Sequence, residues 1–449
     1  MPFLLNTTSE ITPELICDYI KLHREKLSPR YQLLQDYYEG KQKILLRVPR
    51  RENDPCNNIV ANFAKYITDI ASGYHIGEPV SYQSETQELD QLIDLFKKAE
   101  TDVQDMDNAK FQSIYGVAYE LVYLAADKTP RTASIHPSQG FVIYNNTVEL
   151  TPMAGVCYYE QRDVKTQELT GYTVDVSTAN KKMKFTVDRD YGLNNDTVEE
   201  INPFKMVTLI EIYNNNERQG DFEQEISLID GYNKQQSNRV DDKENFVNSL
   251  MVLKGQTLGD TSDEKAETVR SIKENGVVEL DPDGDLSFLT RQVDQQGDDI
   301  LRQSLADDIH KFSYVPSFTD KDFAGNISGV AMQFKLFGLN QLMKSKDRYT
   351  KEGLRYRITL FSNIMGLRGM KPVNVDDIVI TITHSMPKNL VEIAQVISNL
   401  EGICSKETLV SQLPFVDDPE EEVKKATEEH QQDMDEKYVM SAVKGNDKQ

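Results

Sequence analysis

The sequence predicts an α+β protein in which a β-rich middle follows one helical region and precedes another. Between Gly116 and Tyr213 the apolar residues alternate with a period of two, in runs rich in Val, Ile, Tyr and Thr. On both sides the apolar residues recur at helical spacing instead. From Val330 to about Met365 this helical spacing continues without a break. The predicted helix is about three times as long as an average globular helix, which has about 11 or 12 residues. A sheet region of antiparallel type beside helical regions is typical of the α+β class.

The N-terminal region predicts helices with clear start signals. Thr12 is suited to cap a helix whose first position is Pro13, and Ser28 with Pro29 repeats this pattern. Gly40 is expected to end the second helix. A basic, extended stretch then leads to a third helix, which has one apolar stripe formed by Ile59, Phe63, Tyr66, Ile67 and Ile70.

Six strands are predicted in the β-rich region, separated by Gly, Asn, Asp and Pro. They cover residues 117–125, 140–146, 155–162, 171–178, 182–189 and 206–213. A helix from about 222 to 250 follows, and another is expected at 297–312. The residues between these two helices predict a small mixed module with strands at 250–255, 276–280 and 286–290 and a helix at 264–276. The arrangement is that of a tip on a helical hairpin.

The most unusual segment is an irregular loop that opens into the very long helix. The loop, Ser317 to Gly329, is rich in Gly, Asp and Asn, and Ser328 can cap the helix after it. A helix from Val330 to Met365 would span roughly 50 Å at 1.5 Å per residue. Its charged residues exclude a membrane span and a coiled-coil seam. Beyond it we expect a strand near 378–383, helices at 389–400, 405–413 and 419–437, and a polar tail.

Composition limits the function classes. The formal charge is −23, whereas a protein that grips nucleic acid by its phosphates normally carries a basic face. The four cysteines, Cys17, Cys56, Cys157 and Cys404, are scattered without a CxxC pair, which favours neither disulfides nor zinc. The sequence has no secretion signal and no apolar stretch of membrane-spanning length. We therefore expect a soluble protein of a reducing cytoplasm.

No catalytic constellation is evident, and we expect no enzyme activity, cofactor or metal. Asp281, Asp283 and Asp285 are spaced like the first three ligands of a calcium loop. However, Leu286 and Gln292 occupy the positions where such a loop needs Gly and Glu, so a solvated turn is favoured. A metal-dependent nuclease built on these carboxylates stays open as an alternative. Walker A, GxSxG and HExxH strings do not occur.

Two charged clusters are candidates for contacts. The acidic residues between 417 and 436 favour a solvated helix face over a partner site. The long helix carries a basic stripe, for which pairing with acidic surface of the same or a neighbouring subunit is favoured over contact with phosphate. Its members are Lys335, Lys344, Lys346, Arg348, Lys351, Arg355 and Arg357.

Taken together, the order of these parts resembles the portal proteins of tailed bacteriophages, in the branch of siphophages that infect Gram-positive hosts. The resemblance covers nearly the whole chain. Its most specific pieces are NNIVANFAKYITDIASGYHIGEPVSY, PSFTDKDFAGNISGVAMQFKLFGL and ICSKETLVSQLPFVDDPEEEVKKATEE.

The resemblance implies a portal architecture: an α+β wing, a helical stem hairpin, a small α/β clip, a long spoke helix and a helical crown. About twelve such subunits would form a ring around an axial tunnel. The implied parts are the wing at 1–220, stem helices at 221–250 and 297–312, the clip at 251–296, the tunnel loop at 313–329, the long wing helix with a returning strand at 330–386, and the crown with the acidic tail at 387–449.

The resemblance also implies sites and partners. DNA-facing residues of the tunnel loop would be Thr319, Lys321, Asp322, Phe323 and Asn326. The stripe residues implied in subunit packing are Lys344, Lys346, Arg348, Lys351 and Arg355.

The resemblance implies double-stranded DNA that passes through the tunnel without sequence specificity. The other implied partners are the terminase large subunit, a head completion or adaptor protein, and the major capsid and scaffolding proteins. No membrane is implied. The protein would assemble in the host cytoplasm and occupy the portal vertex of the virion. A different phage structural protein, such as a scaffold or minor capsid component, is the alternative.

Overall fold

The α+β prediction is confirmed by a computed structural model, which separates the chain into two compact units. One unit is Met1–Pro316 with Leu339–Thr383, and the other is Ser317–Gly338 with His384–Gln449. The structure describes residues 3–51, 54–84, 88–194, 197–247, 250–254, 261–275, 285–289, 295–318, 329–385, 390–413, 416 and 419–429.

The N-terminal helices begin largely as predicted. The Thr12 hydroxyl accepts a hydrogen bond from the Leu15 amide at 3.4 Å and caps α1 (Pro13–Lys26). Helix α2 (Ser28–Tyr38) differs from the prediction, because Ser28 is its first residue and makes no capping hydrogen bond. Only Leu27 separates the two helices, and its backbone is itself helical, so no extended cap position exists. Gly40 follows α2 with a φ of 83°.

A six-stranded sheet forms the first layer of the β-rich region, with α1 packed on its core. Its strand order is β1-β5-β6-β7-β8-β9, and β1 pairs with β5 in parallel whereas the other pairs are antiparallel. The sequence predicts neither β1 nor β9, because three residues are too few for a pattern and β9 is exposed at every position. The bounds are β1 Phe3–Leu5, β5 Gly140–Asn145, β6 Pro152–Arg162, β7 Leu169–Thr178, β8 Lys181–Asp188 and β9 Val198–Ile201.

A second, three-stranded sheet has the order β10-β3-β4 and packs against helices. Its strands are β3 (Val117–Leu124), β4 (Pro130–Ile135) and β10 (Leu209–Tyr213), and β4 was not predicted. Helices α4 (Glu88–Ala99) and α10 (Phe337–Leu367) supply apolar side chains to the same core, and α5 (Thr101–Tyr115) contacts β3 and β4. Gly353 lets α10 approach β10 closely, since a Cβ there would lie 2.7 Å from Ile212 Cγ1.

The long helical segment is two helices rather than one. Helix α9 covers Gly329–Lys335, Leu336 interrupts the helical backbone, and α10 then runs for 31 residues, or about 46 Å. Gly338 lies just after the break, and a glycine in a helix interior costs about 1 kcal/mol relative to alanine. The interruption therefore falls where the helix is weakest.

Helix α10 is fixed to the sheet by buried ion pairs. Arg357 is fully buried, and its Nε donates to Glu120 Oε1 at 2.6 Å while its terminal nitrogen bonds both Glu120 and Asp105. Asn108 donates to the second Glu120 oxygen at 2.9 Å. Burial acts to lower the pKa of Arg357, but the two carboxylates outweigh it and raise that pKa, so the guanidinium stays charged. Lys346 makes a second buried pair, with Asp221.

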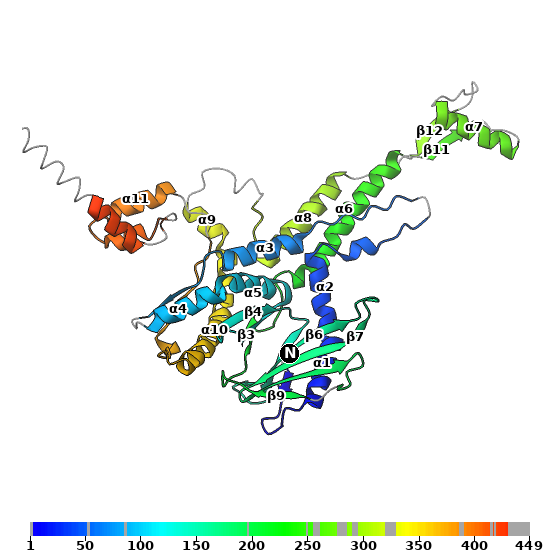
Figure 1. Ribbon diagram of the computed structural model, residues 1–449. Coiled ribbons are helices and arrows are strands. Elements are labelled where there is room, and N and C mark those ends of the chain that lie inside the picture. Colours follow the sequence, from blue (N-terminus) through cyan, green and yellow to red (C-terminus); the bar gives the residue numbers. More distant parts are fainter. Residues whose placement is uncertain are drawn as a thin grey trace, which may run out of the picture. The chain divides into compact units, whose positions relative to one another are not determined.

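Helices α6 (Ile226–Val247) and α8 (Gln295–Ser313) lie side by side as the predicted hairpin, although α6 begins only after a short 3-10 turn at Glu223–Glu225 (Figure 1). Gln235 donates to Asp298 at 3.0 Å, and Arg239 pairs with Asp299 at 2.7 Å. Between these helices in sequence, β11 (Leu250–Lys254) pairs antiparallel with β12 (Asp285–Leu289), and α7 covers Ser262–Asn275. The expected strand at 276–280 lies outside the described residues.

An extended segment, here called the strap (residues 41–51 and 54–62), runs along α6 (Figure 1). It contains the 3-10 turn Lys43–Leu46 and precedes α3 (Phe63–His75). Its alternate backbone amides donate to α6 side chains four residues apart, through three bonds: Asn57 to Asp241 at 2.7 Å, Ile59 to Ser237 at 3.0 Å and Ala61 to Asn233 at 2.8 Å.

The repeats of strap and helix match, which explains this ladder. Two residues of extended chain span about 6.6 Å, and four residues of helix span about 6 Å. The acceptors on Asn233, Ser237 and Asp241 are all buried, so they replace the partner strand that an extended segment normally requires.

The remaining elements are short. Strand β2 (Ser81–Gln83) pairs antiparallel with β13 (Val379–Thr381), which confirms the predicted strand in a shorter form. In the second unit, α11 covers Leu390–Leu400 and α12 covers Lys406–Val410, and residues 419–429 are helical. Ser405 caps α12 by accepting from the Thr408 amide at 3.2 Å.

We predict that Ser237→Ala combined with Asn233→Ala loosens the strap. The amides of Ile59 and Ala61 lose buried acceptors, each worth about 1–3 kcal/mol when left unmet. Hydrogen exchange measured by mass spectrometry over residues 57–62 is expected to accelerate at least tenfold. Ser304→Ala, on the exposed face of α8, is the control and should leave these rates unchanged. Equal protection in both variants would contradict the ladder.

We predict that Arg357→Met lowers the free energy of unfolding by about 3–5 kcal/mol, because two buried carboxylates lose their partner. Arg355→Met, two residues earlier on the exposed face of α10, should change it by less than about 0.5 kcal/mol. Urea unfolding followed by circular dichroism measures both values. Similar losses in the two variants would show that the buried network does not hold α10.

Candidate functional site

The exposed surface of α10 carries the basic residues that the sequence singles out. Lys344, Arg348, Lys351 and Arg355 follow one another at intervals of four, three and four residues, so they share one face of the helix. Three are exposed and Lys351 is half-buried. Within the described part of the chain none of the four forms an ion pair. We reserve the name basic stripe for these four residues.

Lys346 does not belong to this stripe, which corrects the sequence-based grouping. It lies two positions from Lys344 and Arg348, and two residues turn a helix by about 200°. Its ammonium group is buried and pairs with Asp221 in the same chain. Arg357 also faces inward. Sequence spacing alone did not separate the inward cations from the outward ones, because both groups are charged and regularly spaced.

The region where α6 begins is electrostatically unusual. Burial of Glu225 raises the pKa of its carboxyl to about 7, and the nearby charge of Asp221 adds to the effect. Asp221 is itself paired with Lys346 from α10. The Asp221–Lys346 pair thus connects the segment before α6 to α10, beside a buried carboxyl whose pKa is raised.

A cavity of about 460 Å³ lies on another flank of α10. Its lining combines tyrosines and glutamates: Tyr144, Tyr213, Tyr349, Tyr356, Glu149, Glu211 and Glu352. Glu211 is already engaged, since it accepts from Tyr144 at 2.8 Å and pairs with Arg218 at 3.1 Å. Glu149 and Glu352 are exposed and make no ion pair among the residues described. Aromatic faces next to free carboxylates suit a cationic side chain.

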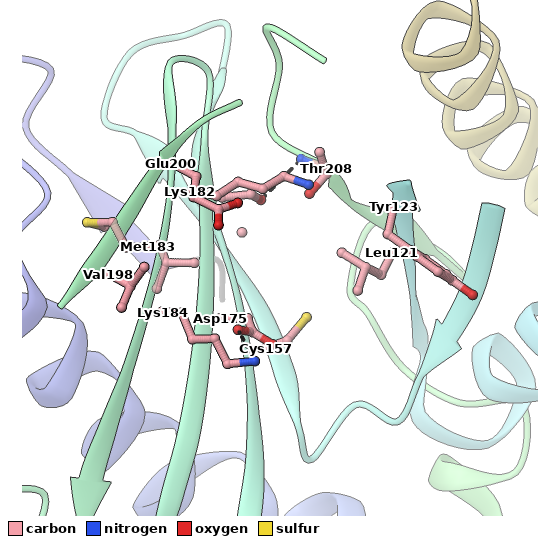
Figure 2. A pocket seen from close by; sticks show the side chains of 13 residues that line it. Leu121, Tyr123, Cys157, Asp175, Lys182, Met183, Lys184, Val198, Glu200 and Thr208 are labelled. Atoms are coloured by element: carbon pink, nitrogen blue, oxygen red, sulfur yellow. Dashed lines mark hydrogen bonds and ion pairs between the residues drawn. The ribbon is translucent and has the colours of Figure 1, made fainter. Parts of the chain in front are cut away.

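A second cavity, of about 240 Å³, opens between the two sheets (Figure 2). Leu121 and Tyr123 of β3 face Cys157 of β6 and residues of β8 across it. Burial raises the pKa of Cys157 to about 12, so its thiol stays protonated and unreactive. Lys184 and Asp175 lie 3.6 Å apart at its edge. This lining has no activated nucleophile, and we interpret the cavity as a gap in the packing of the sheets.

The other candidate residues fall largely outside the described structure. Thr319, Lys321, Asp322, Phe323 and Asn326 of the loop all lie there. So do Asp281 and Asp283 of the acidic turn, whereas Asp285 is the first residue of β12. Among the residues that the structure describes, no group of three or more His, Cys, Asp or Glu side chains is arranged to hold a metal ion.

No described helix combines the length and apolar character that crossing a membrane requires.

Two features that sequence reasoning missed had signals in the sequence. Glu120 occupies an inward position between Ala118 and Val122 in the alternating pattern of β3, where a charged residue must find a buried partner. Asn233, Ser237 and Asp241 recur every four residues on α6, which is a polar stripe on a buried face. In both cases the sequence pattern indicates that a polar residue is buried, but it does not indicate which residue is its partner.

Comparison with known proteins supplies two curated relatives. The chain is 24% identical over 384 residues to the portal protein of Bacillus phage SPP1, covering 82% of this chain and 75% of that protein. It is 25% identical over 433 residues to the portal protein of Clostridium phage phiCD119, covering 89% of this chain and 93% of that protein.

Among solved structures, the chain is similar to a protein in the neck of an empty GTA particle computed with C6 symmetry and in the neck of a native GTA particle computed with C12 symmetry. The TM-score is 0.44 and the identity 9% in each case. The first match covers 78% of this chain and 88% of that chain, and the second 79% and 89%.

The family profile that matches this chain is described as phage portal protein, SPP1 Gp6-like, and the match extends over residues 18–436. Proteins of this family are structural components of the virion and not enzymes. Because the match covers most of the sequence, this chain belongs to the SPP1 Gp6-like family of phage portal proteins.

Proposed function

We propose that copies of this chain form a closed ring at one vertex of the capsid, through which double-stranded DNA enters and leaves the head. The observation that carries this proposal is the family match over residues 18–436, together with two relatives that are themselves portal proteins. The same match favours a portal over a scaffold, a minor capsid component or a nuclease. Electron micrographs of the purified protein viewed along the ring axis test it, and a ring of about twelve subunits is expected.

The proposed parts of the ring follow the chain order. Residues 1–220 form the wing, α6 and α8 the stem, and the module from β11 to β12 the clip. Residues 313–329 form the tunnel loop, and 387–449 the crown. The hairpin of α6 and α8 with a small module at its tip supports the stem and clip assignments, because such a hairpin carries its tip away from the sheets.

Charge supports a conduit that guides DNA without gripping it. The chain has 73 acidic and 50 basic residues. A tunnel wall with this average composition is negatively charged and repels the phosphates of DNA. Counterions soften this repulsion beyond about 10 Å at ordinary salt. DNA then slides past the wall with few strong contacts, and residues of the tunnel loop touch its backbone weakly.

The driving force comes from a partner in this proposal. The sequence has no nucleotide-binding motif, so the terminase large subunit would dock at the clip and hydrolyse ATP. A head completion or adaptor protein would take the same place after packaging. Major capsid and scaffolding proteins would surround the wing, and assembly would take place in the host cytoplasm.

The basic stripe is proposed to join neighbouring subunits. A ring requires each copy to present two different faces, one to each neighbour. The stripe and the tyrosine-lined cavity lie on different faces of α10, about a third of a turn apart. The cations of the stripe would therefore meet Glu149 and Glu352 of the next copy, where each charge finds the partner that it lacks among the described residues of its own chain.

We predict that Arg348→Glu with Lys351→Glu reduces the fraction of protein in rings at least tenfold, as measured by native mass spectrometry. Adding Glu149→Lys and Glu352→Lys should restore rings, because the signs are exchanged on both faces. Lys165→Glu with Arg189→Glu changes the same charge at exposed loops and is the control. Normal rings that fail to retain DNA in the first variant would assign the stripe to DNA contact instead.

We predict that deleting residues 323–326 leaves ring formation intact but reduces the packaging or retention of DNA. The deletion shortens the tunnel loop and leaves α10 unaltered, whose first buried residue is Leu339. Packaging assays with purified capsids, and micrographs of the variant, measure the two effects separately. Packaging at the level of the unaltered protein would remove the assignment of this loop.

A further inference from the structure

The strap presents apolar side chains on the side that faces away from α6. Leu45, Leu46 and Val48 are 46%, 82% and 75% exposed. This arm of the strap is tied to α6 by two side chains, because Gln42 accepts from Asn233 and Arg47 donates to Asp241, and both Gln42 and Ile44 are buried. These two leucines and the valine therefore form a contiguous exposed apolar patch on an ordered segment. A patch of this kind indicates an interaction surface more strongly than single exposed apolar residues do.

The face of α8 that points away from α6 is a second unpartnered surface. Ile300 and Leu301 are 63% and 48% exposed on it. A shallow groove follows this face, lined by Ile300, Gln303, Ser304, Asp307, Asp308 and Lys311. Asp307 is exposed, and neither it nor Asp308 forms an ion pair within the described chain.

These two surfaces lie on opposite sides of the hairpin. The α6 residues that bind the strap are Asn233, Ser237 and Asp241. Those that face α8 are Gly231, Gln235 and Arg239. At about 100° per residue the centres of the two sets are roughly 160° apart around the helix. The order across the hairpin is thus strap, α6, α8 and the exposed face of α8.

The two surfaces also lie at the same height along α6. The side chain of Gln42 is bonded to Asn233 and that of Arg47 to Asp241, so Leu45 and Leu46 fall between these levels. On the other side, Gln235 and Arg239 contact Asp298 and Asp299, which precede Ile300. A copy displaced sideways around a ring axis parallel to the hairpin would bring the leucines of one strap to Ile300 of the next α8.

Their charges are complementary. Every charged residue in the first part of the strap, residues 41–51, is a cation. Lys41 and Arg47 are paired within the chain, with Glu39 and Asp241, and the others are Lys43, Arg50 and Arg51. Helix α8 has more acidic than basic residues, with Asp307 and Asp308 on or beside the exposed groove. Opposite charges at the border of an apolar contact fix its register and disfavour other partners.

We propose that the strap of one copy packs on the exposed face of α8 of the next copy, so that each subunit offers the strap to one neighbour and α8 to the other. This heterologous contact can close into a ring. It rests on the proposed ring and specifies which surfaces form it in the stem. The partner is a second copy of this chain because both halves of the contact match in height, polarity and position.

The test is chemical cross-linking of the full-length protein. Cys56→Ser and Cys404→Ser first remove the two cysteines that are not buried, leaving Cys17 and Cys157 inside the core. Leu46→Cys and Ile300→Cys in the same chain, treated with a short bismaleimide, should give a ladder of covalent oligomers on a denaturing gel. Mixing the two single variants should give dimers only. Val164→Cys with Ile300→Cys is the control, since Val164 is 88% exposed in a loop that is assigned to no subunit contact.

Each outcome separates this contact from the ring itself. Rings in micrographs without a ladder above the control would overturn the contact and leave the ring standing. A ladder without closed rings would support the contact and overturn the ring. Copies that neither associate nor cross-link would overturn both. As a second measurement, Leu46→Asp should reduce the ring fraction at least tenfold, whereas Val164→Asp should not. Equal effects would also contradict the contact.

Discussion

The buried pairing of Arg357 with Asp105 and Glu120 is the constraint on which the placement of α10 depends. A guanidinium inside an apolar core is tolerated only when its charge and hydrogen bonds are met, so α10 cannot turn by even one residue, about 100°, without leaving ions unpaired. Gly353 adds a second restriction by letting the helix lie against β10. Because the inward face is fixed in this way, the outward direction of the basic stripe is fixed too.

The hairpin depends on a different arrangement of polar groups. An extended strap outside any sheet would leave its amides unmet, and α6 supplies acceptors at the matching repeat through Asn233, Ser237 and Asp241. Arg47 joins the same carboxylate, at 2.8 Å from Asp241. The strap runs out along α6 and back again, since Gln42 and Ala61 both bond Asn233, and Arg47 and Asn57 both bond Asp241. This is how a segment without regular secondary structure becomes an ordered surface.

Membership of the portal family confirms the expectation of a structural phage component without catalysis of its own. The distribution of charge is consistent with such a role. The chain has a formal charge of −23, and its buried cations Lys346 and Arg357 are neutralised by carboxylates within the fold. Exposed cations lie on the basic stripe of α10 and on the strap.

The sequence by itself determined the α+β class, the six main strands, the helical hairpin with its tip module and the identity of the family, because these depend on local periodicity and on the order of segments. It could not place β1 beside β5, divide α9 from α10 at Leu336 or find the partner of Glu120. Nor could it separate Lys346 and Arg357 from the outward stripe. Only the tertiary structure decided these. Except for the break at Leu336, each depends on which residues meet across 100 or more positions of chain, and a period in the sequence records a face but not what lies against it.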